Sequence, residues 1–203
     1  APLQSTKPYI DRFAAVKDPQ RRTYLAMLAA LDDAVGKITE TVDRNGLGRR
    51  TIIIFISDNG GPTWQTTSAN GALNGVSDRL TVHTADCKEW LRAQVEAGAR
   101  YEVVCVDPPA FAKNRKSAGQ ALGAYKQVNQ LAAQLVAPGG LLFTSSCSHH
   151  VPWDRFEEAV YTGVRAAGRR FVRVRRGGQA ADHPVLPAVP ETEYLKHLVL
   201  ALP

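Results

Sequence analysis

The chain has 203 residues, of which 44% are hydrophobic, 22% charged and 7% aromatic. This composition excludes a disordered tail, a collagen-like repeat and a small disulfide-stapled scaffold. The formal net charge of +6 permits binding to nucleic acid without requiring it, and the length allows one large domain or two small ones.

The three cysteines, Cys87, Cys105 and Cys147, are odd in number and widely spaced. They argue against a disulfide framework and favour a reducing, cytoplasmic compartment. No apolar run approaches the roughly 20 residues of a membrane span, so we expect no membrane partner.

The first part of the chain predicts one helix and one strand. Asp18-Pro19 is typical of a helix start, and Asn45-Gly46 is a plausible stop. Residues 51–56 are β-branched and apolar, as in a strand that is covered on both faces. The small and polar residues of 65–78 then indicate a boundary, which gives domains 1–72 and 73–203. The apolar face of the predicted helix consists of Tyr24, Leu28, Leu31, Val35 and Ile38.

Beyond this boundary, strands and helices alternate, which predicts an α/β chain with a doubly wound, mostly parallel sheet. The predicted strands are residues 80–84, 101–106, 140–145, 171–176 and 194–202, and the predicted helices are residues 87–97, 117–136 and 152–167.

Ligands bind at the carboxyl ends of the strands in such a sheet, so the residues just after each strand are candidates for a site. Asp86, Asp107 and Cys147 follow three of the predicted strands. We expect the Cys147 thiol and the Asp107 carboxylate to lie side by side at this edge.

Rigid and aromatic residues follow Asp107. Pro108 and Pro109 have no backbone N–H and a fixed φ, and Phe111 adds an aromatic ring. Such a corner suits a planar base, with Asp107 at its polar edge and Phe111 against its face.

Five motifs in order carry a resemblance to a known family. The motifs are Leu73-Asn-Gly-Val-Ser-Asp-Arg79, Asp107-Pro-Pro-Ala-Phe-Ala-Lys113, Gly123-Ala-Tyr-Lys-Gln-Val-Asn129, Pro138-Gly-Gly-Leu-Leu-Phe-Thr-Ser-Ser-Cys-Ser148, and Asp182-His-Pro-Val185 with Pro190-Glu-Thr-Glu-Tyr-Leu-Lys196. With these motifs, residues from about 70 to 203 resemble the C-terminal part of the catalytic domain of class I, S-adenosylmethionine-dependent ribosomal RNA methyltransferases. The branch that makes 5-methylcytosine in large-subunit RNA is the most similar.

The resemblance implies a partial Rossmann-like sheet, mostly parallel with an antiparallel last strand, and a covalent reaction on RNA. The Cys147 thiolate would add to cytosine C6, which makes C5 able to attack the methyl group of S-adenosylmethionine. Asp107 would contact the cytosine edge, and Asp86 the adenine amino group. The implied substrate-binding residues are Pro108, Pro109 and Phe111, and the implied cofactor-binding residues are Asp86 and Asp107.

Simpler roles stay open for these residues. Asp86 could only cap the following helix, Cys147 could be an inert thiol, and Phe111 could only pack against the core. The adjacent pair His149-His150 lacks a third ligand, which disfavours a metal site.

The C-terminal arginines could contact phosphates, although a solvated sheet edge has the same pattern and is favoured. Arg173 and Arg175 are expected to share one face of a strand, with Val172 and Val174 on the other. The candidates are Arg165, Arg169, Arg170, Arg173, Arg175 and Arg176.

The first part of the chain carries a different set of motifs: Arg21-Arg-Thr-Tyr-Leu-Ala-Met27, Leu31-Asp-Asp-Ala-Val-Gly36, Ile54-Phe-Ile-Ser-Asp-Asn-Gly-Gly-Pro62 and Thr66-Thr-Ser-Ala-Asn-Gly-Ala-Leu-Asn-Gly75. With these motifs, residues 9 to about 75 resemble a different family, the sulfatases of the alkaline-phosphatase-like fold. Asp58 and Asn59 match positions that bind calcium in that family, and oxygen ligands suit this ion. The same residues would also form an ordinary turn that ends a strand.

The sequence thus predicts a join of two partial domains. The Gly-rich loop that approaches the cofactor should precede Leu73, and no such spacing is found there. We therefore expect weak binding of S-adenosylmethionine and an impaired RNA methyltransferase. The alternatives are a calcium-dependent sulfate ester hydrolase fragment and a non-catalytic recombination product.

Overall fold

A computed structural model describes residues 5–27, 29, 33, 44, 72, 75, 77–112, 114–179 and 185–203. The chain divides into two compact units, Ala1–Arg49 and Arg50–Pro203. None of the described helices has the length and hydropathy that a membrane span requires.

The first unit contains the short helix α1 (Lys7–Asp11) and a second helix that starts at Pro19 and continues through Met27. Asp18 caps this second helix, because its Oδ1 accepts hydrogen bonds from Gln20 N at 2.8 Å and Arg21 N at 3.1 Å. The predicted helix start is therefore confirmed.

The prediction that Tyr24 belongs to the buried, apolar face of this helix is wrong. Tyr24 is 51% exposed, whereas Ala26 is fully buried. Successive helical residues are about 100° apart, so Ala26 lies nearly opposite Tyr24, and the buried side is the other one. The rest of this face (Leu28, Leu31, Val35 and Ile38) and the predicted strand at 51–56 lie outside the described residues.

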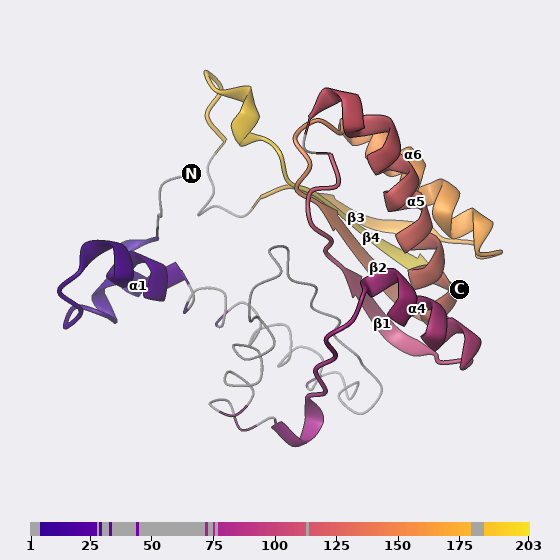
Figure 1. The fold of residues 1–203 in the computed structure, drawn as a ribbon, viewed down its shortest axis with the longest axis horizontal. Helices are drawn as coiled ribbons and strands as arrows, with labels where there is room; N and C mark the ends of the chain where they lie inside the picture. The colour runs from indigo at the N-terminus through magenta and orange to yellow at the C-terminus, as the bar shows by residue number, and fades with distance from the viewer. Residues whose placement is uncertain are drawn as a thin grey trace. The chain divides into compact units, whose positions relative to one another are not determined.

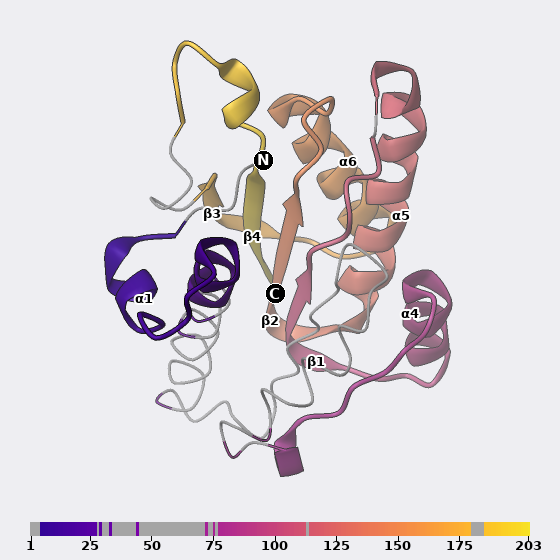
Figure 2. The same ribbon diagram turned by 60° about the vertical axis from the view of Figure 1, so that its left-hand side comes forward.

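The second unit contains a four-stranded sheet with the order β1-β2-β4-β3 (Figure 2). β1 and β2 are parallel, and β4 is antiparallel to both β2 and β3. Three strands therefore run in one direction and the last strand of the chain runs against them, as predicted. The strands are β1 (Tyr101–Val106), β2 (Val136–Ser146), β3 (Val172–Gly177) and β4 (Lys196–Leu202).

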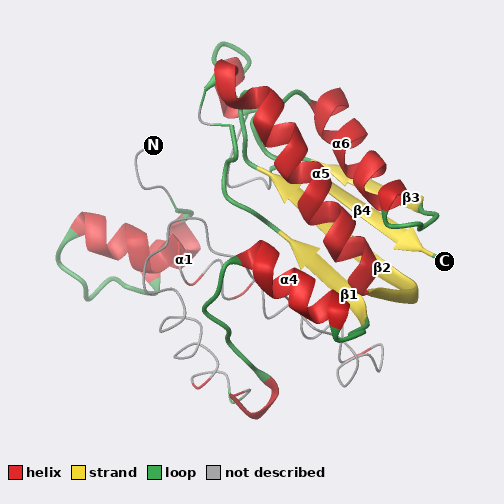
Figure 3. Ribbon diagram, turned by 45° about the vertical axis from the view of Figure 1, so that its right-hand side comes forward, coloured by secondary structure: helices red, strands yellow, loops and turns green. Residues whose placement is uncertain are grey.

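Three helices cover one face of this sheet (Figures 1 and 3). They are α4 (Cys87–Glu96), α5 (Ala118–Leu135) and α6 (Trp153–Ala166). Their inward side chains meet those of the strands in one apolar core, in which Tyr125 of α5 and Phe156 of α6 are the largest fully buried residues.

The strand predicted for residues 80–84 is wrong. This segment is irregular and follows a short 3-10 helix at Ser77–Arg79. The described sheet ends at β1, and no described strand pairs with residues 80–84. A β-strand needs a neighbour for its N–H and C=O groups, so alternating apolar residues alone do not produce one.

The third predicted strand begins earlier than expected. The chain passes from α5 at Leu135 directly into β2 at Val136, so Pro138-Gly-Gly140 lies inside the strand. A Cβ at Gly140 would lie 2.5 Å from the Glu102 carbonyl oxygen, so only glycine fits this close approach to β1.

Candidate functional site

Two loops that carry predicted site residues leave the sheet side by side. Val106, the last residue of β1, pairs with Thr144 of the parallel strand β2. The loop that begins at Asp107 and the loop that begins at Cys147 therefore start from neighbouring strands at the same edge, as expected of a doubly wound sheet.

A buried hydroxyl network, formed by Tyr125, Ser146 and Ser148, joins these two loops. Ser146 Oγ donates to Tyr125 OH at 2.8 Å, and Tyr125 OH lies 2.8 Å from Ser148 Oγ. Ser148 Oγ in turn accepts from Ala112 N, in the loop after β1, at 3.3 Å. Burial raises the pKa of Tyr125, so the phenol stays protonated and α5 holds both loops through neutral hydrogen bonds.

The predicted catalytic pair reaches solvent to different degrees. Asp107 is exposed, and Cys147 is half-buried. Both side chains are thus accessible to a ligand at the end of the sheet. Direct contact between the Asp107 carboxylate and the Cys147 sulfur stays a prediction.

Phe111, which was predicted to lie against the face of a bound base, also packs against the core. Phe111 is half-buried and packs on Tyr125, with ring centroids 4.8 Å apart and the planes at 59°. Pro108 is buried and Pro109 half-buried. The packing role of Phe111 is therefore real, and contact of these three residues with a base stays a prediction.

Asp86 caps α4, as the simpler interpretation expected. Its Oδ1 accepts from Lys88 N at 2.9 Å and Glu89 N at 3.0 Å. Both bonds use the same oxygen of an exposed side chain, which leaves Oδ2 for another donor. Asp86 can therefore cap the helix and accept an N–H from a ligand at the same time, which fits the adenine end of the implied cofactor.

The sequence reading missed Lys196. Its side chain is buried (3% exposed), and its Nζ donates to the carbonyl oxygens of Ser148 at 3.0 Å and Tyr194 at 2.8 Å. A signal was present, because Lys196 alternates in phase with Leu198, which faces the core. A lysine at an inward position of a buried strand is rare without a specific partner.

The other two cysteines are poor nucleophiles. Burial raises the pKa of Cys105 to about 11 and also raises the pKa of Cys87. The described residues hold no group of three or more His, Cys, Asp or Glu side chains that could bind a metal, and the rings of His149 and His150 contact each other edge to face. The predicted calcium positions Asp58 and Asn59 lie outside the described residues.

β3 is the exposed edge strand that the arginine pattern favoured, but the arginines are arranged differently. Arg173 pairs with Leu200 and Arg175 with Val199, which are adjacent residues of β4 and face opposite sides. The predicted shared face of Arg173 and Arg175 is therefore wrong, because a bulge at Val174 shifts the alternation.

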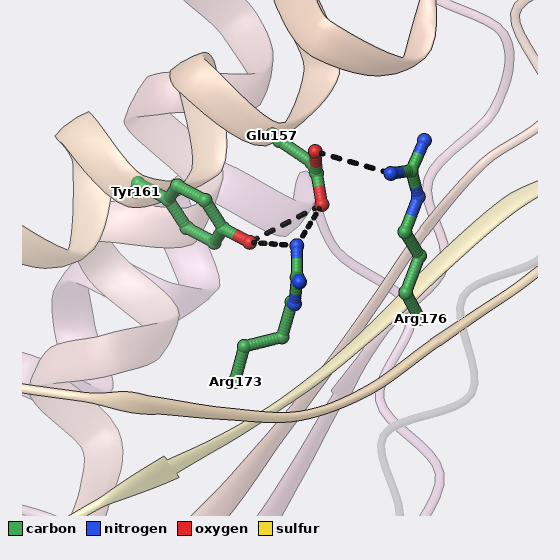
Figure 4. Close-up of polar contacts among 4 residues, drawn as sticks. All are labelled: Glu157, Tyr161, Arg173 and Arg176. Carbon is green, nitrogen blue, oxygen red and sulfur yellow. Dashed lines mark hydrogen bonds and ion pairs between the residues drawn. The ribbon is translucent and has the colours of Figure 1, made fainter.

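Glu157 of α6 holds two of these arginines (Figure 4). It accepts from Arg173 at 2.8 Å, and Arg176 lies 3.8 Å from its other oxygen. Tyr161 donates to the same carboxylate at 3.2 Å. These contacts fasten the edge strand to α6, so they give Arg173 and Arg176 a structural role.

Arg169 is likewise occupied by the fold. Its guanidinium donates to the carbonyl oxygens of Val136 at 2.5 Å and Leu202 at 3.2 Å, with longer contacts to those of Ala133 and Ala137. It closes the junction between α5 and β2 against the end of β4, so the phosphate role considered for Arg169 is not supported.

Comparison with known proteins finds two kinds of similarity in this chain. Residues 1–96 match the Sulfatase family model. The ribosomal RNA large subunit methyltransferase I of Shewanella denitrificans is 40% identical over 136 residues, which cover 66% of this chain and 34% of the relative. The enzyme of the same name from Shewanella amazonensis is 41% identical over 135 residues, with the same coverage. The chain thus spans about a third of the length of these relatives.

Solved structures support the fold of the second unit. A protein assigned as a methyltransferase and complexed with SAH has a TM-score of 0.56 at 15% identity, covering 70% of this chain and 37% of that one. A protein assigned as a SAM-dependent methyltransferase from Streptococcus mutans has a TM-score of 0.52 at 13% identity, covering 68% and 36%. The described sheet and helices therefore have the Rossmann-like fold of class I methyltransferases.

The two sequence similarities overlap, since matches of 96 and 136 residues cannot lie side by side in 203 residues. The chain therefore combines a sulfatase-like beginning with similarity to S-adenosylmethionine-dependent rRNA methyltransferases over about two thirds of its length.

Proposed function

We propose that the second unit carries the catalytic side of an S-adenosylmethionine-dependent rRNA methyltransferase that modifies cytosine at C5 through a covalent adduct with Cys147. The hydroxyl network of Tyr125, Ser146 and Ser148 is the observation that carries this proposal. It links the loop after Asp107, through Ala112, to the loop that carries Cys147 and to the same helix, which supports a common site for the two groups at the end of the sheet.

The chemistry assigns a separate task to each residue. The Cys147 thiolate forms a bond to C6, the C5–C6 π electrons move to a C4–C5 double bond, and N3 takes up the C4–N3 electrons with a proton, which makes C5 nucleophilic. After C5 has been methylated, a base removes the C5 proton and the C6–S bond breaks, which restores the C5–C6 double bond and releases the thiolate. Asp107, which is exposed, accepts a hydrogen bond from the base edge and orients the ring. Phe111, Pro108 and Pro109 provide the wall beside it.

S-adenosylmethionine supplies the electrophilic methyl group when it is bound. The free Oδ2 of Asp86 suits the adenine amino group, and Asp107 is the second residue that would contact the cofactor. We retain the expectation of weak binding, because the sequence before Leu73 shows no Gly-rich loop of the required spacing.

The test uses a large-subunit rRNA transcript that contains 5-azacytosine. This base has a nitrogen at position 5. Once the methyl group has been transferred to N5, no proton at this position can be lost to release the thiolate, so the adduct at C6 persists. We expect the chain to form a covalent RNA complex on a denaturing gel when S-adenosylmethionine is supplied in large excess, which offsets weak cofactor binding.

Cys147→Ser should abolish the complex, since the hydroxyl is a much weaker nucleophile at neutral pH. Cys87→Ser is the matched control, because Cys87 belongs to α4 and not to the loops after β1 and β2, and it should form the complex like the unmodified chain. An adduct of equal yield in Cys147→Ser would exclude the covalent role.

The match of residues 1–96 to the Sulfatase family favours a second proposal for the beginning of the chain. Residues 1–72 would be a sulfatase-like domain fragment joined to a methyltransferase-like domain at residues 73–203. Asp58 and Asn59 would be its remaining calcium ligands. No cysteine of this chain has the context of the sulfatase nucleophile, so the methyltransferase proposal is preferred.

A further inference from the structure

Lys196 lies against the loop of Cys147. In the antiparallel pairing of β2 and β4, Lys196 is the partner of Ser146, the residue before Cys147. Its Nζ donates to the carbonyl oxygen of Ser148, the residue after Cys147, at 3.0 Å. The ammonium group of Lys196 is therefore hydrogen-bonded to the backbone of the loop that contains Cys147.

The fold keeps this ammonium in place. Its second hydrogen bond, to the Tyr194 carbonyl oxygen, is 2.8 Å long, and the side chain is only 3% exposed. An ammonium group has three N–H donors, and the two carbonyl groups take two of them. One donor is left for an anion beside it.

We propose that Lys196 is a positioning residue that holds the thiol of Cys147 as a thiolate. Ionisation breaks the S–H bond, the proton passes to water, and both electrons stay on the sulfur. Lys196 remains protonated throughout. Its role in catalysis rests on the function proposed above, whereas the ionisation of Cys147 is a property of the protein without RNA or cofactor.

The charges support this pairing. Burial lowers the pKa of Lys196, whereas the negative charge of the nearby Cys147 thiolate raises it. The attraction between two groups is mutual, so an ammonium that is stabilised by the thiolate also stabilises the thiolate. A buried lysine without an anionic partner would only lose solvation.

The other titratable groups around the thiol do not replace Lys196. Tyr125 is kept neutral, because burial and the charge of Cys147 both raise its pKa. His197 bonds Ser145 through Nδ1 at 3.0 Å, and burial and Arg175 lower its pKa. The remaining groups are Asp107, whose negative charge opposes the thiolate, and His149 and His150, which follow in the chain.

The experiment measures the pH dependence of alkylation of Cys147 by iodoacetamide, in a parent chain that carries Cys87→Ser and Cys105→Ala so that one thiol remains. We expect the midpoint to lie at least about one pH unit below 8.5, the ordinary value for cysteine. Lys196→Met, which keeps the side-chain length without the charge, should raise the midpoint by about one unit or more. At neutral pH the rate would then fall about tenfold.

Lys126→Met is the control, because Lys126 is an exposed residue of α5 and should leave the midpoint unchanged. An unchanged midpoint in a folded Lys196→Met variant would overturn the proposal. Where that variant does not fold, the parent decides, since a midpoint at or above 8.5 also overturns it. A low midpoint without an adduct on azacytosine RNA would instead contradict the proposed function and leave the ion pair in place.

Discussion

Cys105 shows how a single buried thiol makes the stability of this protein depend on pH. Its pKa rises well above the ordinary value for cysteine, to about 11, mainly because burial disfavours the thiolate and also because Asp107 adds negative charge. The folded state therefore keeps the proton in a range where the unfolded state releases it. Stability from this residue is present below pH 9 and is lost as the pH rises toward 11.

We compare the free energy of unfolding of the unmodified chain with that of Cys105→Ala. Between pH 8 and pH 11, we expect the unmodified chain to lose about 2 kcal/mol of this free energy relative to the variant. Urea denaturation at the two pH values measures it. The lysines and tyrosines titrate in both proteins, so they cancel in the comparison. A difference that stays constant would mean that Cys105 is solvated in the folded state.

At the scale of elements, α5 and α6 are packed so closely that glycine is required at one position. A Cβ at Gly163 of α6 would lie 2.5 Å from the Lys126 carbonyl oxygen of α5, closer than any carbon atom can approach. Because backbone atoms rather than a flexible side chain are in the way, the helices themselves would have to separate.

Gly163→Ala should therefore destabilise the second unit by about 1–3 kcal/mol, despite the better helix propensity of alanine. Gly123→Ala on α5 is the control, since Gly123 is exposed and a Cβ there meets no atom within 4 Å. This control should stabilise the chain by about 0.5–1 kcal/mol. If the close contact exists, Gly163→Ala lowers the Tm and Gly123→Ala raises it. If the contact does not exist, the Tm of both variants shifts in the same direction.

At the scale of the whole molecule, the described residues of the two compact units differ in how many are buried. Among the described residues of Ala1–Arg49, only Ala26 is buried, whereas the second unit buries a continuous apolar core between its sheet and helices. Little hydrophobic stabilisation comes from the described part of the first unit, because stabilisation scales with the apolar area that is buried.

We therefore expect the first unit to unfold at lower urea than the second. Trp64, Trp90 and Trp153 all lie beyond residue 49, so tryptophan fluorescence reports the second unit alone, while far-ultraviolet circular dichroism reports the helices of both. The circular dichroism transition should begin before the fluorescence transition. Coincident curves would show that the chain unfolds as one unit.

The local patterns of the sequence were sufficient for most of the second unit. The strand predicted at residues 101–106 and the helix at 87–97 match β1 and α4 closely, and the later helices and strands were found within a few residues. These elements are set by periodicity and by stop signals such as Gly168, which act within a few residues of the chain.

Features that depend on a distant partner were not readable in this way. Residues 80–84 have the alternation of a strand but no described neighbour to pair with. The bulge at Val174, which moves Arg173 and Arg175 to opposite sides, exists only in the pairing of β3 with β4.

The residue content of the candidate site came from the sequence, because Asp107 and Cys147 follow strands whose ends define a binding edge. Only the tertiary structure revealed what surrounds them. Tyr125 joins their loops from α5, and Lys196 reaches the backbone beside Cys147 from a strand 49 residues later in the chain. Such contacts arise from the register of paired strands and from the packing of a helix on them, which no local pattern of residues encodes.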